Sequence, residues 1–135
     1  RRLLAGRALT MRLLLDTHVL LWALHDPARL GRKTRTLIER SQTLVSVASL
    51  WEISIKAALG KLKASPHEVL DAIEPSGFDL LPIQPAHAVE VFTLGTLHGD
   101  PFDRLLVAQA QAERLTLLTF DTALRSFGPC VRCVE

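Results

Sequence analysis

The stretch RLLLDTHVLLWAL, residues 12–24, joins a short apolar run to an acid and then to a longer apolar run. Residues 12–16 have the length and composition of a strand that is buried on both faces, and residues 17–24 have those of a helix. A buried strand that leads directly into a helix is typical of α/β proteins. The sequence therefore predicts a strand that ends at Asp16 and a helix that follows it.

The rest of the chain repeats this alternation. Further strands are predicted at 43–48, 78–83, 115–120 and 130–134. Helices are predicted at 32–40, 49–62, 65–77, 85–95 and 103–114, with a short one from Asp121. Strands that alternate with helices favour a three-layer α/β/α domain with a central, mainly parallel sheet.

Length and composition fit one globular domain. The chain has 135 residues, of which 48% are hydrophobic and 22% are charged. Its longest purely apolar run, VLLWAL at 19–24, is far shorter than the ~20 residues that a membrane span needs. Arg7 and Arg12 interrupt the apolar start of the chain, so no secretory signal core forms there. We therefore expect a cytoplasmic protein with no membrane partner.

The first ten residues form a separate question. Met11 directly precedes the first predicted strand, so we expect residues 1–10 to be an upstream extension or a cloning remnant outside the fold. Three of the arginines lie in this segment, and without them the formal charge of +2 becomes −1. Net charge therefore gives little support for a nucleic-acid partner.

Cys130 and Cys133 are the two cysteines of the chain. Two thiols alone do not complete a structural zinc site. In a strand, residues three positions apart point to opposite faces, which argues against joint metal ligation. A redox pair remains an alternative to two small strand residues, and the sequence does not assign the role of these cysteines.

Acids recur where predicted strands meet helices. Asp16 ends the first strand, Glu52 lies early in the helix after the second, and Asp121 follows the strand at 115–120. Asp100 and Asp103 lie at the start of the helix predicted at 103–114. Helix capping explains each acid taken alone: Ser49 to Glu52 reads as a capping box, while Asp100 and Asp121 suit N-cap positions.

The sheet topology adds a second interpretation for the acids as a set. The carboxyl ends of parallel strands lie at one edge of a sheet, where α/β proteins bind ligands. Carboxylates gathered there repel one another, and a bound cation relieves the repulsion. Oxygen ligands without Cys or His favour a hard ion, Mg²⁺ or Mn²⁺. Such an ion, with open positions for phosphate oxygens, is typical of metal-dependent phosphodiesterases.

Four segments carry a resemblance to a known family. LLLDTHVLLW, VSVASLWEISIK, DPFDRLLVAQA and LLTFD resemble, in this order, the acidic motifs of PIN-domain ribonucleases, and in particular those of VapC-type toxins of bacterial toxin–antitoxin pairs. The resemblance covers residues 11–135 and implies one PIN domain over that range. It further implies a Mg²⁺-dependent endoribonuclease, with Mn²⁺ as a substitute, that acts on RNA as a homodimer and is silenced by a cognate antitoxin.

The resemblance also assigns roles to single residues. Asp16, Glu52, Asp103 and Asp121 match the family's catalytic, metal-binding acids, and Asp100 matches an accessory acid. Thr17 and Thr119 occupy positions suited to orienting a carboxylate or a water, although Thr17 equally suits a turn cap. Arg104 is expected either to contact substrate phosphate or to pair with Asp100.

Basic residues and rival functions complete the expectations. A path for RNA is one interpretation of seven basic residues, and a solvated helix face is the other: Arg29, Arg32, Lys33, Arg35, Lys56, Lys61 and Lys63.

An aspartyl-nucleophile phosphatase is a rival function, but it usually has a second acid two residues after the nucleophile, where this chain has His18. A non-catalytic binding module with a degenerate site is the other rival, and the complete acidic set argues against it.

Overall fold

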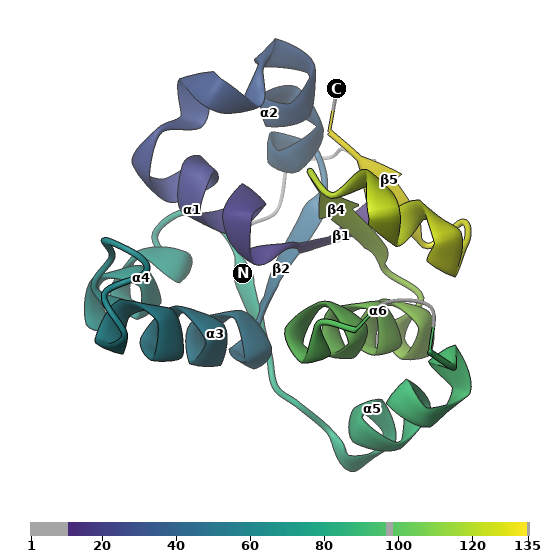
Figure 1. The fold of residues 1–135 in the computed structure, drawn as a ribbon. Coiled ribbons are helices and arrows are strands. Elements are labelled where there is room, and N and C mark those ends of the chain that lie inside the picture. Colours follow the sequence, from purple (N-terminus) through teal and green to yellow (C-terminus); the bar gives the residue numbers. More distant parts are fainter. Residues whose placement is uncertain (1–10, 97–98, 135) are drawn as a thin grey trace.

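The computed structural model describes residues 11–96 and 99–134, so the expectation for residues 1–10 lies outside the described residues. The strands of this part form one parallel sheet in the order β3-β2-β1-β4-β5, which confirms the predicted fold class (Figure 1). The strands are β1 (Arg12–Leu15), β2 (Gln42–Ser46), β3 (Asp79–Leu81), β4 (Thr116–Thr119) and β5 (Val131–Cys133). All four neighbouring pairs are parallel.

Helices connect the strands and cover the sheet. The α-helices are α1 (Thr17–His25), α2 (Arg32–Glu39), α3 (Val47–Ala58), α4 (Pro66–Ile73), α5 (Pro85–Glu90) and α6 (Pro101–Glu113). Three short 3-10 helices are η1 (Pro27–Leu30), η2 (Val91–Leu94) and η3 (Thr122–Phe127). Within the described ranges, no helix combines the length and the apolar composition that crossing a membrane requires.

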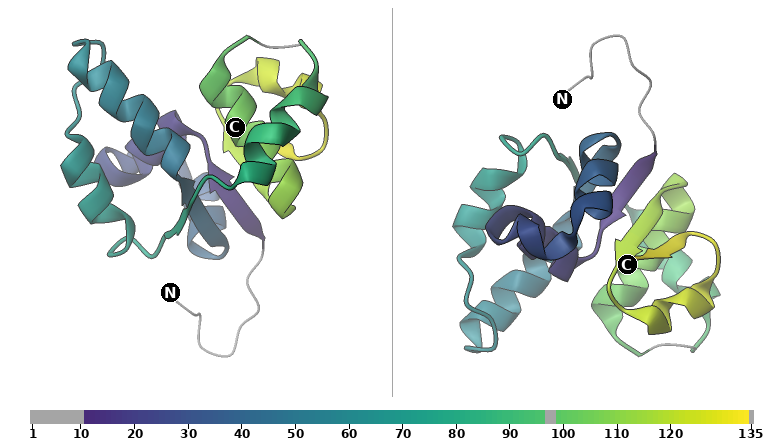
Figure 2. Two further views of the ribbon diagram at one scale, coloured as in Figure 1. Left: turned by 90° about the horizontal axis from the view of Figure 1, so that it is seen from below. Right: turned by 90° about the horizontal axis from the view of Figure 1, so that it is seen from above.

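Apolar residues of the central strands alternate between two cores. Leu13 and Leu15 belong to one core with residues of α1 to α4, whereas Leu14 belongs to the other with residues of α6 and η3. All three leucines are fully buried, as expected for a strand covered on both faces. Figure 2 shows the purple β1 running between these two groups of helices. The two cores therefore fix the end of β1, where Asp16 lies, between the two helical layers.

The helix after β2 begins earlier than the sequence predicts. Val47 is its first residue and Ser46 is its N-cap, with the Ser46 hydroxyl accepting a hydrogen bond from the Ala48 N–H at 2.9 Å. The capping-box interpretation of Ser49 and Glu52 is therefore wrong, because both residues lie inside the helix. Ser46 is the N-cap because it is the last residue of β2 and α3 begins at the next residue. The chain therefore passes from strand to helix without a loop.

A buried polar chain links α3, α5 and α6. The Ser46 hydroxyl donates to Gln109 Oε1 at 2.5 Å, and Gln109 Nε2 lies 3.3 Å from His87 Nδ1. His87 is fully buried, and its Nδ1 accepts a hydrogen bond from the Gln84 N–H at 2.9 Å. Its other ring nitrogen, Nε2, therefore carries the proton and donates to Glu113 Oε2 at 2.8 Å. This chain positions α3 against α6, the helices that carry Glu52 and Asp103.

We expect His87→Leu to lower the free energy of unfolding by about 2 kcal/mol, because it leaves the Gln84 N–H and the buried amide of Gln109 without their shared acceptor. Val89→Ala, at a position 72% exposed on the same helix, should change it by less than about 0.5 kcal/mol. Urea unfolding of both variants measures the difference. Equal stability of the two variants would contradict the role assigned to the polar chain.

Candidate active site

Asp16 lies where the order of the strands reverses. From β1 the chain first continues to β2 on one side, and β4 later pairs with β1 on the other side. The Asp16 N–H donates to the Leu118 carbonyl of β4 at 3.0 Å, which fixes the start of α1 beside the end of β4. In open parallel sheets, ligands bind in the crevice at this kind of point.

The Asp16 carboxylate is buried and held by a hydroxyl. Its residue is 7% exposed, and its Oδ2 accepts a hydrogen bond from Thr119 Oγ1. Burial raises the pKa of Asp16, and the nearby charge of Glu52 raises it further. The hydrogen bonds from Thr119 and from the Thr17 backbone act in the opposite direction. The site thus holds a carboxylate whose ionised form a cation would stabilise.

Glu52 projects from the second turn of α3 and has both oxygens engaged. Thr17 Oγ1 donates to its Oε1 at 2.6 Å, and the same hydroxyl lies 2.9 Å from that of Ser49. Lys56, one turn later, places its Nζ 2.5 Å from Glu52 Oε2. Thr17 directly follows Asp16, so its contact with Glu52 connects the first two acids of the expected set.

The acids of α6 reach the same region through an aromatic contact. The rings of Trp51 on α3 and Phe102 on α6 lie 5.0 Å apart in an edge-to-face arrangement. Both rings lie next to expected metal ligands in the sequence. Trp51 directly precedes Glu52, and Phe102 directly precedes Asp103. Asp100 caps α6, since its Oδ1 accepts a hydrogen bond from the Asp103 N–H at 3.0 Å. Asp100 therefore has a capping contact, while Asp103 is half-buried in the first turn.

Asp121 follows β4 and caps η3. Its Oδ1 accepts a hydrogen bond from the Ala123 N–H at 2.9 Å, and its own N–H donates to Thr119 Oγ1 at 3.0 Å. Thr119 thus bridges the Asp16 side chain and the Asp121 backbone. This double contact had only a weak sequence signal, a threonine two residues before an acid.

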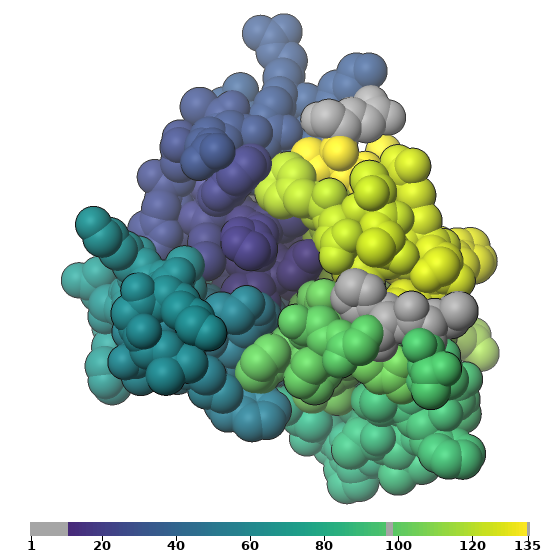
Figure 3. Space-filling model, in the orientation of Figure 1, coloured from purple at the N-terminus to yellow at the C-terminus, as the bar shows by residue number. Residues whose placement is uncertain are grey.

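The segments that carry the acids surround a hollow. In the space-filling view, the purple surface of the β1–α1 segment is recessed between teal α3, green α6 and the yellow segment of η3 (Figure 3). Among the described residues, however, no three Asp, Glu, His or Cys side chains form a group that could hold one metal ion. The donors fit Mg²⁺ in their chemistry, because all are oxygens and one is a desolvated carboxylate. Binding of an ion would require the side chains to move closer together.

Several of the expected basic side chains have different local surroundings in the structure. Arg104 donates to the carbonyls of Gly95 and Val91 at 2.5 and 3.3 Å, contacts that neither expectation for this residue included. Arg29 lies over the Trp22 ring, 4.0 Å from its centroid. Lys56 and Lys61 instead line a pocket of about 250 Å³ that also includes Glu52, beside the acids.

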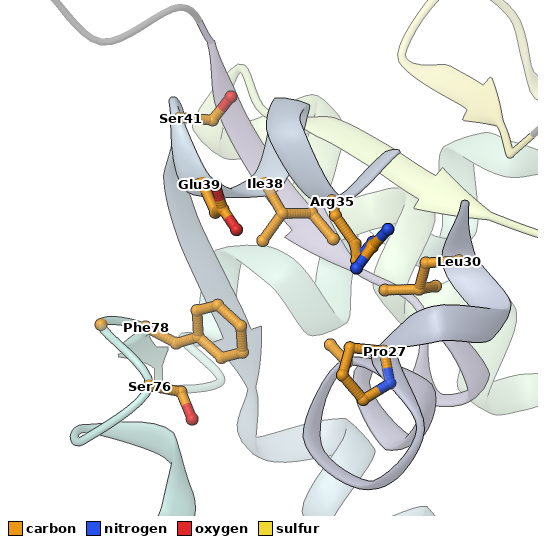
Figure 4. Close-up of a pocket in the computed structure, with 10 residues that line it drawn as sticks. Pro27, Leu30, Arg35, Ile38, Glu39, Ser41, Ser76 and Phe78 are labelled. Atoms are coloured by element: carbon orange, nitrogen blue, oxygen red, sulfur yellow. The ribbon is translucent and has the colours of Figure 1, made fainter. Parts of the chain in front are cut away.

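A separate pocket of about 310 Å³ lies away from the acids (Figure 4). Ser41 and Phe78 line it, and these residues directly precede β2 and β3, at the amino ends of the strands. Arg35 also lines this pocket, together with apolar Pro27 and Leu30. Asp16 and Asp121 follow the carboxyl ends of β1 and β4, so this pocket is not part of the candidate active site.

The buried acid predicts a pH-dependent gain in stability for Asp16→Asn. Burial raises the pKa of Asp16 above its ordinary value of 3.8, so the folded state binds the proton more tightly than the unfolded state. The free energy of unfolding contributed by this group therefore falls as pH rises through the interval above 3.8. In EDTA, Asp16→Asn should be more stable than wild type at neutral pH, and the gain should vanish towards pH 3.8. Urea unfolding across this pH range tests it, and a loss of stability at neutral pH would contradict it.

Solved structures share this fold at low sequence identity. The chain is similar to one in VapBC2 from Rickettsia felis bound to a promoter DNA fragment, with a TM-score of 0.70, 19% identity and coverage of 91% of this chain and 98% of that chain. For a chain of the DNA-bound VapBC from Salmonella typhimurium, the TM-score is 0.64 and the sequence identity 19%, with 93% of this chain and 100% of that chain covered. For a chain of a toxin–antitoxin complex from Klebsiella pneumoniae, the TM-score is 0.62 and the sequence identity 21%, with 90% of this chain and 97% of that chain covered.

A comparison with curated protein sequences finds no match. The family model of the PIN domain, in contrast, matches residues 13–128. This range begins in β1 and ends just after η3, so it contains every acid described above. The chain therefore belongs to the PIN domain family.

Proposed function

We propose that this protein is a Mg²⁺-dependent endoribonuclease and the toxin of a toxin–antitoxin pair. The observation that supports the proposal is a hollow at the switch point of a PIN fold, bordered by the segments to which Asp16, Glu52, Asp103 and Asp121 belong. PIN domains are generally nucleases. Chains of toxin–antitoxin complexes also match this fold over nearly their whole length, which supports the toxin assignment.

We assign the metal ion to Asp16, Asp103 and Asp121, with Glu52 completing the acidic set and Mn²⁺ as a substitute ion. A bound Mg²⁺ would polarise the scissile phosphoryl group and lower the pKa of a water. Thr119 holds the Asp16 carboxylate, and Thr17 holds that of Glu52. Asp100 fixes the first turn of α6, and with it the backbone of Asp103. These contacts restrict the orientations of the Asp16 and Glu52 carboxylates and of the Asp103 backbone before an ion binds.

A partner surface adjoins the acids. Trp51, Ile55 and Leu59 recur every four residues on α3 and are 55%, 37% and 63% exposed. Trp51 contacts Phe102 beside Asp103, so a segment bound along these three residues would also cover the acids. We assign this surface to the cognate antitoxin, because an inhibitor has to block access to the site.

A second exposed apolar pair supports a homodimer. Val89 and Phe92, on α5 and η2, are 72% and 89% exposed. Neither belongs to the α3 surface, so a second copy of the chain could bind there together with the antitoxin. Sedimentation of the purified toxin as a monomer at micromolar concentration would count against this assignment.

The variant Asp103→Asn tests the metal role. It removes one negative charge at almost constant size, so we expect Mg²⁺-dependent RNA cleavage to fall by at least about a hundredfold. The fold should survive, because Asn tolerates the first turn of a helix and the acidic repulsion decreases. Cleavage of total RNA and thermal stability, each with Mg²⁺ and with EDTA, provide the measurements.

Asp100→Asn is the matched control. It keeps a side-chain oxygen that can cap α6, so cleavage should change much less than in Asp103→Asn. If capping were the sole role of both acids, both variants would keep wild-type cleavage. Wild-type cleavage by Asp103→Asn at matched Mg²⁺ would therefore overturn the proposed role.

The antitoxin assignment has its own test. The product of the adjacent gene should bind the purified protein and stop RNA cleavage. Leu59→Ser should weaken that binding by about tenfold, the scale of an interface residue that matters. Leu70→Ser, at a position 47% exposed on α4, should leave it unchanged. Absence of binding to that product under all conditions would contradict the toxin–antitoxin assignment.

A further inference from the structure

Lys56 is a basic residue in direct contact with Glu52, one of the acids described above. Its Nζ lies 2.5 Å from Glu52 Oε2, and the side chains of Lys56 and Glu52 are 37% and 7% exposed. Glu52 is therefore a buried carboxylate paired with a cation that reaches it from the solvent side. The sequence places the two residues one helical turn apart, a spacing common in surface ion pairs, and gave no reason to single this pair out.

We propose that the Lys56 ammonium is the counter-ion of the acidic cluster in the metal-free protein and competes with the divalent ion for it. This inference rests on the metal site of the proposed function. It assigns to Lys56 the role of setting metal affinity, rather than that of an ordinary helix-surface ion pair.

Both carboxylate oxygens of Glu52 are engaged in hydrogen bonds. Oε1 accepts a hydrogen bond from the Thr17 hydroxyl, and Oε2 accepts one from Lys56. A metal ion that used Glu52 would have to replace one of these donors. The Thr17 hydroxyl is neutral, whereas the Lys56 ammonium repels any cation that approaches. Displacement of Lys56 would therefore free Glu52 Oε2 for the metal ion and would also remove the repulsion between the ammonium and that ion.

The charges around Lys56 are the second argument. Its hydrogen bond to Glu52 is the largest cause that raises the pKa of Lys56, and the charges of Glu52, Asp100 and Asp103 add to it. Two helices thus supply the negative charges that this ammonium senses. The Trp51–Phe102 contact holds these helices together at that point. One fixed positive charge therefore balances acids from both sides of the hollow.

The positive charge of Lys56 also changes the repulsion among the acids near it. An ammonium lowers the repulsion between nearby carboxylates, so these acids can remain ionised without a divalent ion. A divalent ion brings twice the charge and demands direct oxygen ligands. The two cations exclude one another by Coulomb repulsion at a separation of a few ångströms.

The test compares divalent-ion affinity in variants of the full chain, without RNA. Lys56→Met and the milder Lys56→Gln remove the competing charge, so calorimetric titration with Mn²⁺ should show binding about tenfold tighter, or about 1.4 kcal/mol. Lys56→Arg keeps the charge and should bind Mn²⁺ like wild type. Lys63→Gln, at an exposed position, removes the same net charge and controls for a long-range effect.

Each outcome supports or overturns the proposal. Unchanged or weaker binding in Lys56→Gln, with normal binding by wild type, would overturn the role of Lys56 and leave the proposed function intact. No binding by wild type or by any variant would overturn both. Binding by Lys56→Gln but not by wild type would support the competition directly.

A measurement on wild type covers the case in which the variants fail to fold. The ¹⁵Nζ resonance of Lys56 should shift on addition of Mg²⁺, because the ammonium leaves Glu52. A resonance that stays unchanged while the ion binds would overturn the proposal.

Discussion

The desolvated carboxylate of Asp16 is the constraint on which the arrangement of this site depends. Its backbone N–H is tied to β4 through Leu118, so the side chain has to lie between the ends of two central strands. An ionised group buried there is unfavourable unless other groups compensate for the lost water. Thr119 provides a hydrogen bond directly, and Thr17 connects Asp16 to the second acid, Glu52.

The compensation remains incomplete, because Glu52 itself adds to the repulsion. Lys56 offsets the charge of Glu52, and Asp100 and Asp103 act on the same ammonium from α6. Because the negative charge of the buried carboxylates is only partly compensated, binding of a cation would stabilise the site. The buried chain from Ser46 to Glu113 holds α3 and α6 in place while these charges oppose one another.

The alternation of apolar runs was enough to predict the fold class, because a parallel sheet covered on both faces leaves a strong hydrophobic signal in each strand. It also placed Asp16 and Asp121 just after the carboxyl ends of two strands. Helix starts were predicted less well: Ser49 offered a capping pattern, but Ser46 ends the strand and is the N-cap of α3.

Contacts between elements distant in sequence were beyond prediction. His87 lies 26 positions from Glu113 and looked like any helical histidine, although it is fully buried against α6. The pairing of Lys56 with Glu52 was available from spacing, but its significance depends on Asp100 and Asp103, which only the packing of α3 on α6 brings near. Side-chain electrostatics of this kind follow from tertiary packing, which a local pattern does not encode.

Under the proposed function, these carboxylates jointly bind a divalent ion at the switch point of the sheet. Anomalous diffraction from crystals of the full chain grown with Mn²⁺ tests it most directly. The account predicts a manganese peak in the hollow, in contact with Asp16 and with Asp103 or Asp121. A manganese peak that lies away from Asp16, or a hollow without one at a saturating Mn²⁺ concentration, would contradict it.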